Sequence, residues 1–176
     1  QLARLVNRQQ SHAARDLLAM PPPDVHSLAL KQEHDRAFDR LLLDGDGVHL
    51  QSAGGIHHRL DQALQPFAFS GDEALDCTLL GGPSLDFNVM TRRSALRAEV
   101  TVLQAATPVP PAPRGLLLAA RGHWLLHAEG AAQDCAAGQG LWWDGEPHGW
   151  HVQPQGDDLV LLWVHLETVG ADFYER

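Results

Sequence analysis

The spacing of apolar residues changes near residue 38 of the chain. Residues 2–18 place leucine, valine and alanine at approximately helical intervals. Three consecutive prolines at 21–23 end this pattern, because proline lacks the amide N–H of a helix and restricts the residue before it. From residue 38 onward, short apolar runs alternate with glycine and aspartate turn signals, which is typical of β-strands. The pattern predicts a helical or linker segment over residues 1–37, followed by a mainly β chain.

The β region divides into two stretches with the same order of elements. Residues 38–106 and 116–176 each contain a strand, a glycine turn, a second strand, a glycine-rich corner and a closing strand. Asp44-Gly45-Asp46-Gly47 predicts the tight turn of a β-hairpin in the first stretch. Residues 107–115, TPVPPAPRG, predict a proline-rich connector between the two. Two similar halves indicate a duplicated barrel or a double-sheet jelly roll.

Composition and charge limit the classes of partner that this chain is expected to bind. Hydrophobic residues make up 44% of it, enough for a sizeable core, and the formal charge of −9 disfavours nucleic acid and anionic membranes. No apolar run approaches the roughly 20 residues that span a bilayer. The first residues are too polar for a signal peptide, so we expect a cytoplasmic protein. Cys77 and Cys135 stand far apart in apolar contexts and are expected to be buried, reduced thiols.

Residues 81–94, GGPSLDFNVMTRRS, combine strand-like alternation with charge. Period-two spacing puts four side chains on one face: Asp86, Asn88, Met90 and Arg92. Burying an acid, an amide and a guanidinium together is costly unless they bind one another or a ligand. Three interpretations stay open: an internal polar cluster in which Arg92 closes a corner, a pocket wall where Arg92 or Arg93 pairs a substrate carboxylate, and solvent-exposed polarity without a role.

The chain has 11 histidines, which raises the question of a metal site. His57 and His58 are adjacent and point to opposite faces of a strand, so they do not ligate one ion together. Zinc, iron or manganese needs three or four convergent ligands. We expect ordinary surface or core histidines, with His123, His127 and His148 as the alternative metal-ligating set.

Other candidate chemistry is weak. Ser70 and Ser84 lack the G-x-S-x-G context of a serine nucleophile. Trp142, Trp143 and Trp150 fit core packing better than the mouth of a binding site.

Three stretches together resemble the HutD/Ves family. FDRLLLDGDGVHLQ is similar to that family's tyrosine-Asp-Arg, strand, Gly-x-Gly segment, with Phe38 in the tyrosine position. PFAFSGDEALDCTLLGGPSLDFNVMTRRS closely resembles the family's central signature. WLLHAEG and LWWDGEPHGWHV resemble its more variable C-terminal half. The resemblance runs from about Phe38 to Leu166; the family's N-terminal signature, Trp-Lys-Asn-Gly-Gly-Gly and a Trp-Arg strand, has no counterpart before residue 38.

The resemblance implies a bicupin, with two cupin-like halves that are double-stranded β-helices (jelly rolls) without the usual metal ligands and without a cofactor. Members of the family are associated with bacterial histidine utilisation. They are proposed to bind an intermediate such as formiminoglutamate or urocanate and to restrain flux without catalysis. Carried over by position, four residues belong to the family's polar set near the pocket: Arg40, Asp86, Asn88 and Arg92.

We therefore expect a non-enzymatic protein that binds a small carboxylated metabolite and modulates histidine catabolism. Arg92 or Arg93 is expected to pair the carboxylate, while Asp86 and Asn88 bind the nitrogen end. The alternative is a metal-dependent cupin isomerase or dioxygenase that uses the histidine set named above. A third interpretation is an interaction protein whose tryptophans form a homodimer surface. Ligand identity and oligomeric state stay open.

Overall fold

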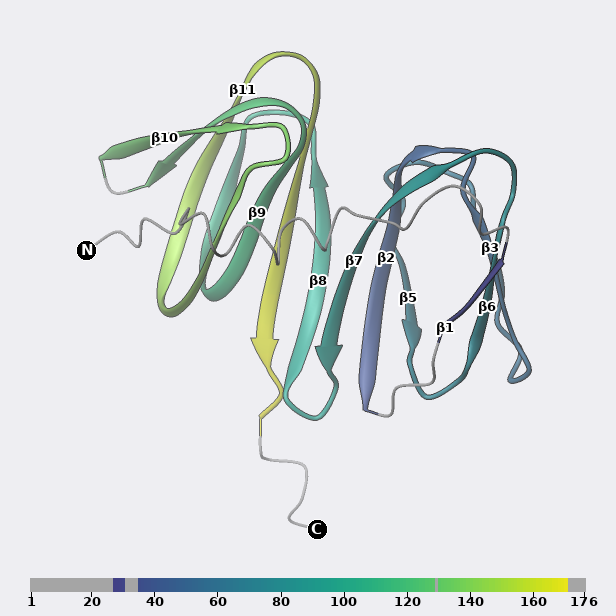
Figure 1. Cartoon of the computed structure of the whole chain (residues 1–176). Helices are drawn as coiled ribbons and strands as arrows, with labels where there is room; N and C mark the ends of the chain where they lie inside the picture. Colours follow the sequence, from purple (N-terminus) through teal and green to yellow (C-terminus); the bar gives the residue numbers. More distant parts are fainter. Residues whose placement is uncertain (1–26, 31–34, 129, 171–176) are drawn as a thin grey trace. The chain divides into compact units, whose positions relative to one another are not determined.

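The structure is a computed structural model that describes residues 27–30, 35–128 and 130–170. Every regular element in this part of the chain is a β-strand (Figure 1). The strands are β1 (Ser27–Leu30), β2 (Arg36–Gly45), β3 (Val48–Ser52), β4 (His57–Leu60), β5 (Phe67–Ser70), β6 (Leu75–Leu79), β7 (Ser84–Arg92), β8 (Leu96–Leu103), β9 (Thr107–Ala128), β10 (Ala131–Ala136) and β11 (Gly140–Thr168). The prediction of a mainly β chain is confirmed. The helix predicted over 2–18 lies outside the described residues, and no membrane-crossing helix occurs within them.

The described residues form two compact units. The first unit contains those before Ala98 together with residues 168–170, and the second unit is Ala98–Glu167. In the first unit, one sheet has the strand order β1-β6-β3-β4 and the other has β5-β2-β7. The second unit is built on a four-stranded sheet of order β10-β9-β11-β8. The break between the units falls within β8, earlier in the chain than the connector predicted at 107–115.

The glycines between β2 and β3 connect two sheets. β2 pairs with β5 and β7, whereas β3 pairs with β4 and β6, so the predicted β-hairpin is wrong. Gly45 and Gly47 have φ of 92° and 85°, as the sequence suggested for this turn. A Cβ on Gly45 would lie 2.2 Å from the Pro83 carbonyl oxygen, and one on Gly47 would lie 2.0 Å from that of Leu60. Close backbone approach at a corner therefore explains these glycines.

The core of the first unit lies between its two sheets. It consists of Leu42, Val48, Leu50, Leu60 and Cys77, with Ile56, Phe67, Phe69 and Leu79 packed against it. Leu42 comes from one sheet, and the others of the buried set come from β3, β4 and β6. Leu41 and Phe87, which point the opposite way on β2 and β7, are fully buried too. β2 is thus buried on both faces at its centre, which accounts for its unbroken Leu41-Leu42-Leu43 run.

The proline-rich residues 107–115 are the first part of β9, where a connector was predicted. They pair antiparallel with β11: Val109 lies opposite Trp150, and Ala112 opposite His148, with irregularities in the register between them. Proline fits extended backbone at a strand edge because its φ is fixed near −65° and no amide hydrogen is needed on a free side. Val109 and Ala112 are buried between exposed prolines, so this segment contributes to the core of the second unit.

Candidate functional site

One face of β7 runs from the core of the first unit to its surface. The register pairs Leu42 with Asp86, Arg40 with Asn88 and Phe38 with Met90 across β2 and β7. Directly opposite residues share a face. Along this face Asp86 is buried, Asn88 is half-buried, and Met90 and Arg92 are exposed. The side chains on this predicted face of β7 therefore become more exposed from Asp86 toward Arg92.

A buried ion pair links β2 and β7 at the buried end of this face. The Arg40 Nε donates to Asp86 Oδ2 at 2.7 Å, and Nη2 of the same guanidinium also contacts Oδ2. The exposed fractions of the two side chains are 4% and 1%. Arg40 Nη1 points to the Cys77 Sγ of β6 at 3.7 Å, so this arginine reaches from one sheet to the other. Arg40, Asp86, Cys77 and the neighbouring Asn88 are called the interior polar cluster below.

Within the described residues, the second carboxylate oxygen of Asp86 has no hydrogen-bond partner. Its Oδ1 is fully buried and makes no hydrogen bond within the described part of the chain. A buried polar atom without a partner costs about 1–3 kcal/mol, and such atoms are rare in native proteins. Arg40 also carries five N–H donors, more than its contacts with Asp86 and Cys77 use. The cluster can therefore accept one hydrogen bond at Asp86 and donate others at Arg40.

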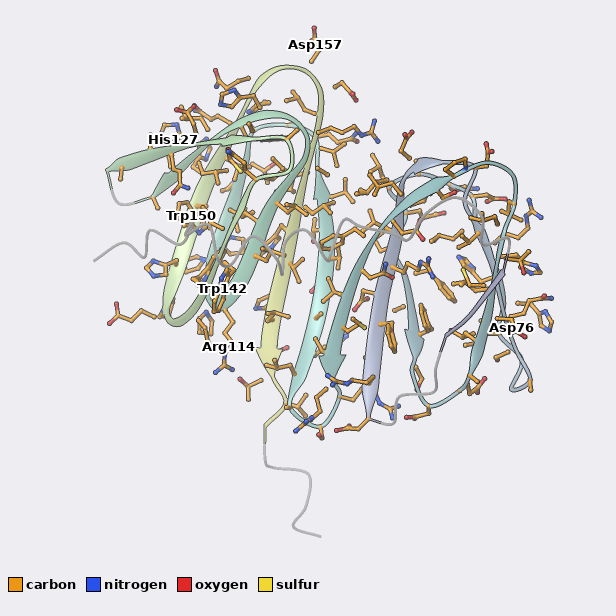
Figure 2. All side chains as sticks on the ribbon, viewed as in Figure 1. Asp76, Arg114, His127, Trp142, Trp150 and Asp157 are labelled. Carbon is orange, nitrogen blue, oxygen red and sulfur yellow. The ribbon has the colours of Figure 1, made fainter. Side chains whose placement is uncertain are left out.

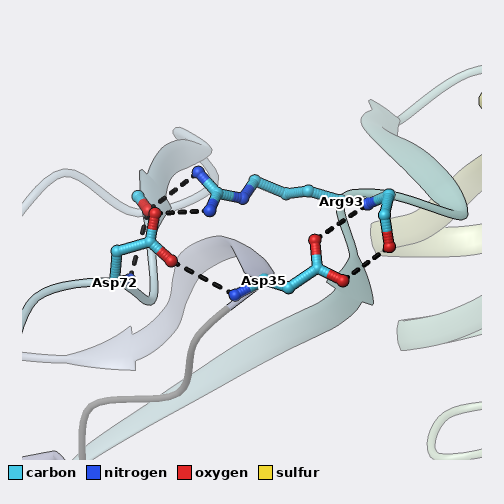
Figure 3. A network of polar contacts seen from close by, with 5 residues as sticks. Asp35, Asp72 and Arg93 are labelled. Atoms are coloured by element: carbon cyan, nitrogen blue, oxygen red, sulfur yellow. Dashed lines mark hydrogen bonds and ion pairs between the residues drawn. The ribbon is translucent and has the colours of Figure 1, made fainter. Parts of the chain in front are cut away.

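Arg93, which the sequence placed in the binding site, is held elsewhere. Figure 3 shows its guanidinium against Asp72, and Nη1 also donates to the Ser70 hydroxyl at 3.2 Å. The amide of Asp35 donates to Asp72 Oδ1 at 3.2 Å, and the Asp35 carboxylate accepts bonds from the amide and hydroxyl of Ser94. This network joins the start of β2, the turn after β5 and the turn after β7. The Arg93 guanidinium is therefore engaged in this turn network.

Arg92 lies at the exposed end of the same face as Asp86. It is opposite Arg36 in the β2–β7 register. A strand rises about 3.3 Å per residue, so the Cα of Arg92 is about 13 Å along β7 from that of Asn88. The five predicted site residues therefore divide into three sets: Arg40, Asp86 and Asn88 together, Arg92 at the rim, and Arg93 in the turn network.

Aromatic side chains border the interior polar cluster, and sequence reasoning missed them. Phe67 is opposite Arg40 in the β2–β5 register. The His58 ring stacks on Phe67 with centroids 3.6 Å apart, Phe69 lies 5.7 Å from Phe67, and Phe38 stacks on Phe69 at 5.1 Å. The alternation Phe67-x-Phe69 was visible in the sequence. Their proximity to Arg40 was not, because it depends on strand pairing across 27 residues of chain.

The alternative metal-ligating histidines do not converge. His123 contacts Asp134 at 3.0 Å, His127 contacts Gln153 at 3.2 Å, and His148 lies edge-on to Trp143. Searching the described residues finds no group of three potential ligands that could hold a metal ion. These histidines therefore serve separate local contacts.

Sequence comparison decides the family. A family model named HutD matches residues 34–162 of the chain. The chain belongs to the HutD family. Protein Ves of Escherichia fergusonii is 32% identical over 152 residues, which cover 79% of this chain and 78% of that protein. Protein Ves of Cronobacter sakazakii is 36% identical over 108 residues, covering 61% of this chain and 57% of that protein. The resemblance to HutD/Ves proteins is confirmed.

Solved structures share the fold of this HutD-family chain. A conserved protein of unknown function from Pseudomonas aeruginosa PAO1 has a TM-score of 0.73 at 25% identity, over 82% of this chain and 78% of that one. HutD from Pseudomonas fluorescens SBW25 has a TM-score of 0.65 at 22% identity, over 82% and 75%. A cupin 2 conserved barrel domain protein from Leptotrichia buccalis has a TM-score of 0.50 at 8% identity, over 80% and 78%. The HutD-family chain is therefore mainly β, with cupin-like structural neighbours.

Proposed function

We propose that this chain is a non-enzymatic, cytoplasmic binding protein of the HutD type that modulates histidine catabolism by holding a small carboxylated intermediate. The observation that carries the proposal is the unpaired Oδ1 of Asp86, buried beside the Arg40 guanidinium. We also propose that the two units are the two cupin halves of a bicupin, with this ligand in the first.

The ligand that fits the interior polar cluster carries both an N–H donor and a carboxylate. The donor satisfies Asp86 Oδ1, and the carboxylate accepts the remaining N–H groups of Arg40 in a charge-assisted hydrogen bond. Asn88, half-buried on the same face, supplies a further amide. Formiminoglutamate and urocanate both have this combination, through a formimino or imidazole nitrogen and one or more carboxylates.

Arg92 is proposed to act at the rim of this site. Its distance along β7 from Asn88 makes it unsuitable for the carboxylate held at Arg40. A second, distal carboxylate is within its reach, and formiminoglutamate has one whereas urocanate does not. Arg92 therefore discriminates between these two ligands in favour of the dicarboxylate.

Calorimetric titration of the folded protein with formiminoglutamate and with urocanate tests the proposal. Asn88→Ala leaves the ion pair intact and is expected to weaken binding about fivefold, the worth of one hydrogen bond of about 1 kcal/mol. Arg92→Ala is expected to weaken formiminoglutamate binding and to leave urocanate unchanged. Arg93→Ala is the matched control, because that arginine binds Asp72.

Several results would contradict this assignment. Failure of both metabolites to bind the folded wild-type protein would refute the ligand class. Unchanged formiminoglutamate binding by the Arg92 variant would remove that residue from the site. Stoichiometric iron, manganese or zinc in the purified protein would favour an enzyme over a binding protein.

A further inference from the structure

The second unit contains a cluster of tryptophans at the edge of its core. The Trp143 and Trp163 rings are stacked, with centroids 5.5 Å apart and planes 8° from parallel. Trp150 packs on Trp143 at 5.9 Å. Figure 2 labels Trp150 among the strands of this unit. Trp143, Trp150 and Trp163 are called the aromatic cluster below.

A glycine lets the stacked rings lie against the sheet. Gly115 of β9 is opposite both Trp143 and His165 in the β9–β11 register. A Cβ at Gly115 would lie 2.4 Å from the Trp163 ring and 2.6 Å from the Trp143 ring. Any side chain at this position would push both indoles away from the backbone. The flat arrangement of the two rings therefore depends on the absence of a side chain here.

One indole N–H of the cluster is buried and has no hydrogen-bond partner in the described part of the chain. Trp143 Nε1 donates to the Ala112 carbonyl oxygen at 2.8 Å, and Trp124, deeper in the same core, donates to Arg121 at 3.1 Å. Trp150 Nε1 is buried and has no acceptor among the residues that the structure describes. Buried indole N–H groups usually find an acceptor. An acceptor from outside the chain would supply the missing hydrogen bond.

Each tryptophan of the cluster keeps a small exposed fraction, unlike Trp124 deeper in the core. Trp124 is 0% exposed, whereas Trp143, Trp150 and Trp163 keep 8%, 9% and 7% of their surface in contact with solvent. Two half-buried imidazoles extend the cluster outward, with His165 stacked on Trp163 and His148 edge-on to Trp143. Two imidazoles that are partly open to solvent therefore border the aromatic cluster.

We infer that the aromatic cluster is a second ligand site, for a small planar ring that carries a hydrogen-bond acceptor, such as an aromatic carboxylate or carboxamide. The ring stacks beside the indoles, and its carbonyl or carboxylate oxygen accepts the Trp150 N–H. Aromatic clusters also bind organic cations, but a quaternary ammonium has no acceptor and would leave that N–H unsatisfied. This site is separate from the interior polar cluster and does not rest on the function proposed for it.

Nuclear magnetic resonance of the ¹⁵N-labelled full chain tests the inference. The chain has 5 tryptophans and hence as many indole N–H groups, and the Trp150→Phe protein identifies the Trp150 signal by its loss. Titration with benzoate and with benzamide is expected to move this signal downfield while the signal of exposed Trp142 stays in place. Trp150→Phe, which keeps an aromatic ring and removes the donor, is expected to bind the probes about tenfold more weakly in calorimetry. Trp142→Phe is the matched control and keeps wild-type affinity.

Three outcomes would overturn the inference. An unmoved Trp150 signal at millimolar benzoate and benzamide shows that neither probe reaches the N–H. Equal affinities of wild-type and Trp150→Phe proteins show that the donor does not take part. Tetramethylammonium that moves the indole signals and displaces the probes identifies a cation site instead.

Discussion

The two units of this chain have interiors of opposite chemistry. The first unit buries a charged pair, Arg40 and Asp86, between its sheets, and the second buries the tryptophans 124, 143, 150 and 163. Among the buried polar atoms that have no hydrogen-bond partner within the described residues are a carboxylate oxygen of Asp86 in the first unit and the indole N–H of Trp150 in the second. The Asp86 oxygen lacks a donor, and the Trp150 N–H lacks an acceptor. The two β units of this chain thus differ in a few inward-facing residues, while strand pairing supplies the framework of each.

The largest effect separating the two interiors is expected from breaking the ion pair. Arg40→Met leaves the buried Asp86 carboxylate unpaired and is expected to destabilise the first unit by about 3–5 kcal/mol. The double variant Arg40→Met/Asp86→Leu removes both charges, so it is expected to recover most of that loss. Urea denaturation of the three proteins measures the difference. A double variant as unstable as the single one would show that packing, not the uncompensated charge, causes the loss.

The corresponding change in the second unit acts through sterics. Gly115→Ala forces a methyl group against the Trp143 and Trp163 rings and is expected to cost about 1–3 kcal/mol. Gly170→Ala, at a position with open space and no unusual φ, is the control and is expected to have little effect. Equal stabilities of the two variants in urea denaturation would mean that the tryptophan rings move aside freely.

Acid is expected to weaken the first unit through its turn network. The Ser94 hydroxyl bonded to Asp35 and the Arg93 guanidinium bonded to Asp72 hold the pKa of each carboxyl below its ordinary value. A lowered folded-state pKa stabilises the fold above the unfolded pKa of about 4, and the stabilisation is lost as the pH falls through the folded value. The urea midpoint is expected to fall less between pH 7 and pH 3 in Arg93→Gln than in wild type. Arg59→Gln, which breaks an exposed pair with Asp61, is expected to keep the wild-type pH dependence.

The smallest expected difference concerns the two thiols. Burial raises the pKa of both Cys77 and Cys135, so neither reacts readily with a thiol reagent. The Arg40 charge opposes the rise at Cys77, whereas in the second unit a backbone hydrogen bond from Ala119 opposes it at Cys135. We expect Cys77 to react a few-fold faster, as measured with Cys77→Ser and Cys135→Ser single-thiol proteins. Faster reaction at Cys135 would contradict this ranking.

Short-range pattern was sufficient to predict a mainly β chain and which residues share one face of β7. Alternation between polar and apolar residues placed Asp86, Asn88 and Arg92 together on it, and the register agrees. Prediction failed where a local signal has two outcomes. The Asp44–Gly47 glycines serve a corner between sheets as well as they would serve a hairpin, and the prolines at 107–115 occur in edge strands as well as in connectors.

The partners of the candidate site depend on pairing between distant segments, which sequence pattern does not contain. Arg40 meets Asp86 across 46 residues and Cys77 across 37. Arg93 bonds Asp72 and Ser70 in the turn after β5. The alternation of polar and apolar residues does not predict that this turn lies near the end of β7. The sequence placed Arg92 on the face of Asp86 but left both Arg92 and Arg93 as candidates for the carboxylate, and the structure separates the rim residue from the turn residue.

The prolines of β9 affect whether this segment can pair with strands of other molecules. Along 107–112, β11 is the one described strand that pairs with β9, so within the described residues the opposite side of this segment has no strand partner. An open edge recruits strands from other molecules through its amide hydrogens. Pro108, Pro110 and Pro111 have no amide hydrogen to offer. We therefore expect these prolines to limit pairing of this edge with other molecules, and substituting valine for them is expected to make concentrated solutions of the protein precipitate.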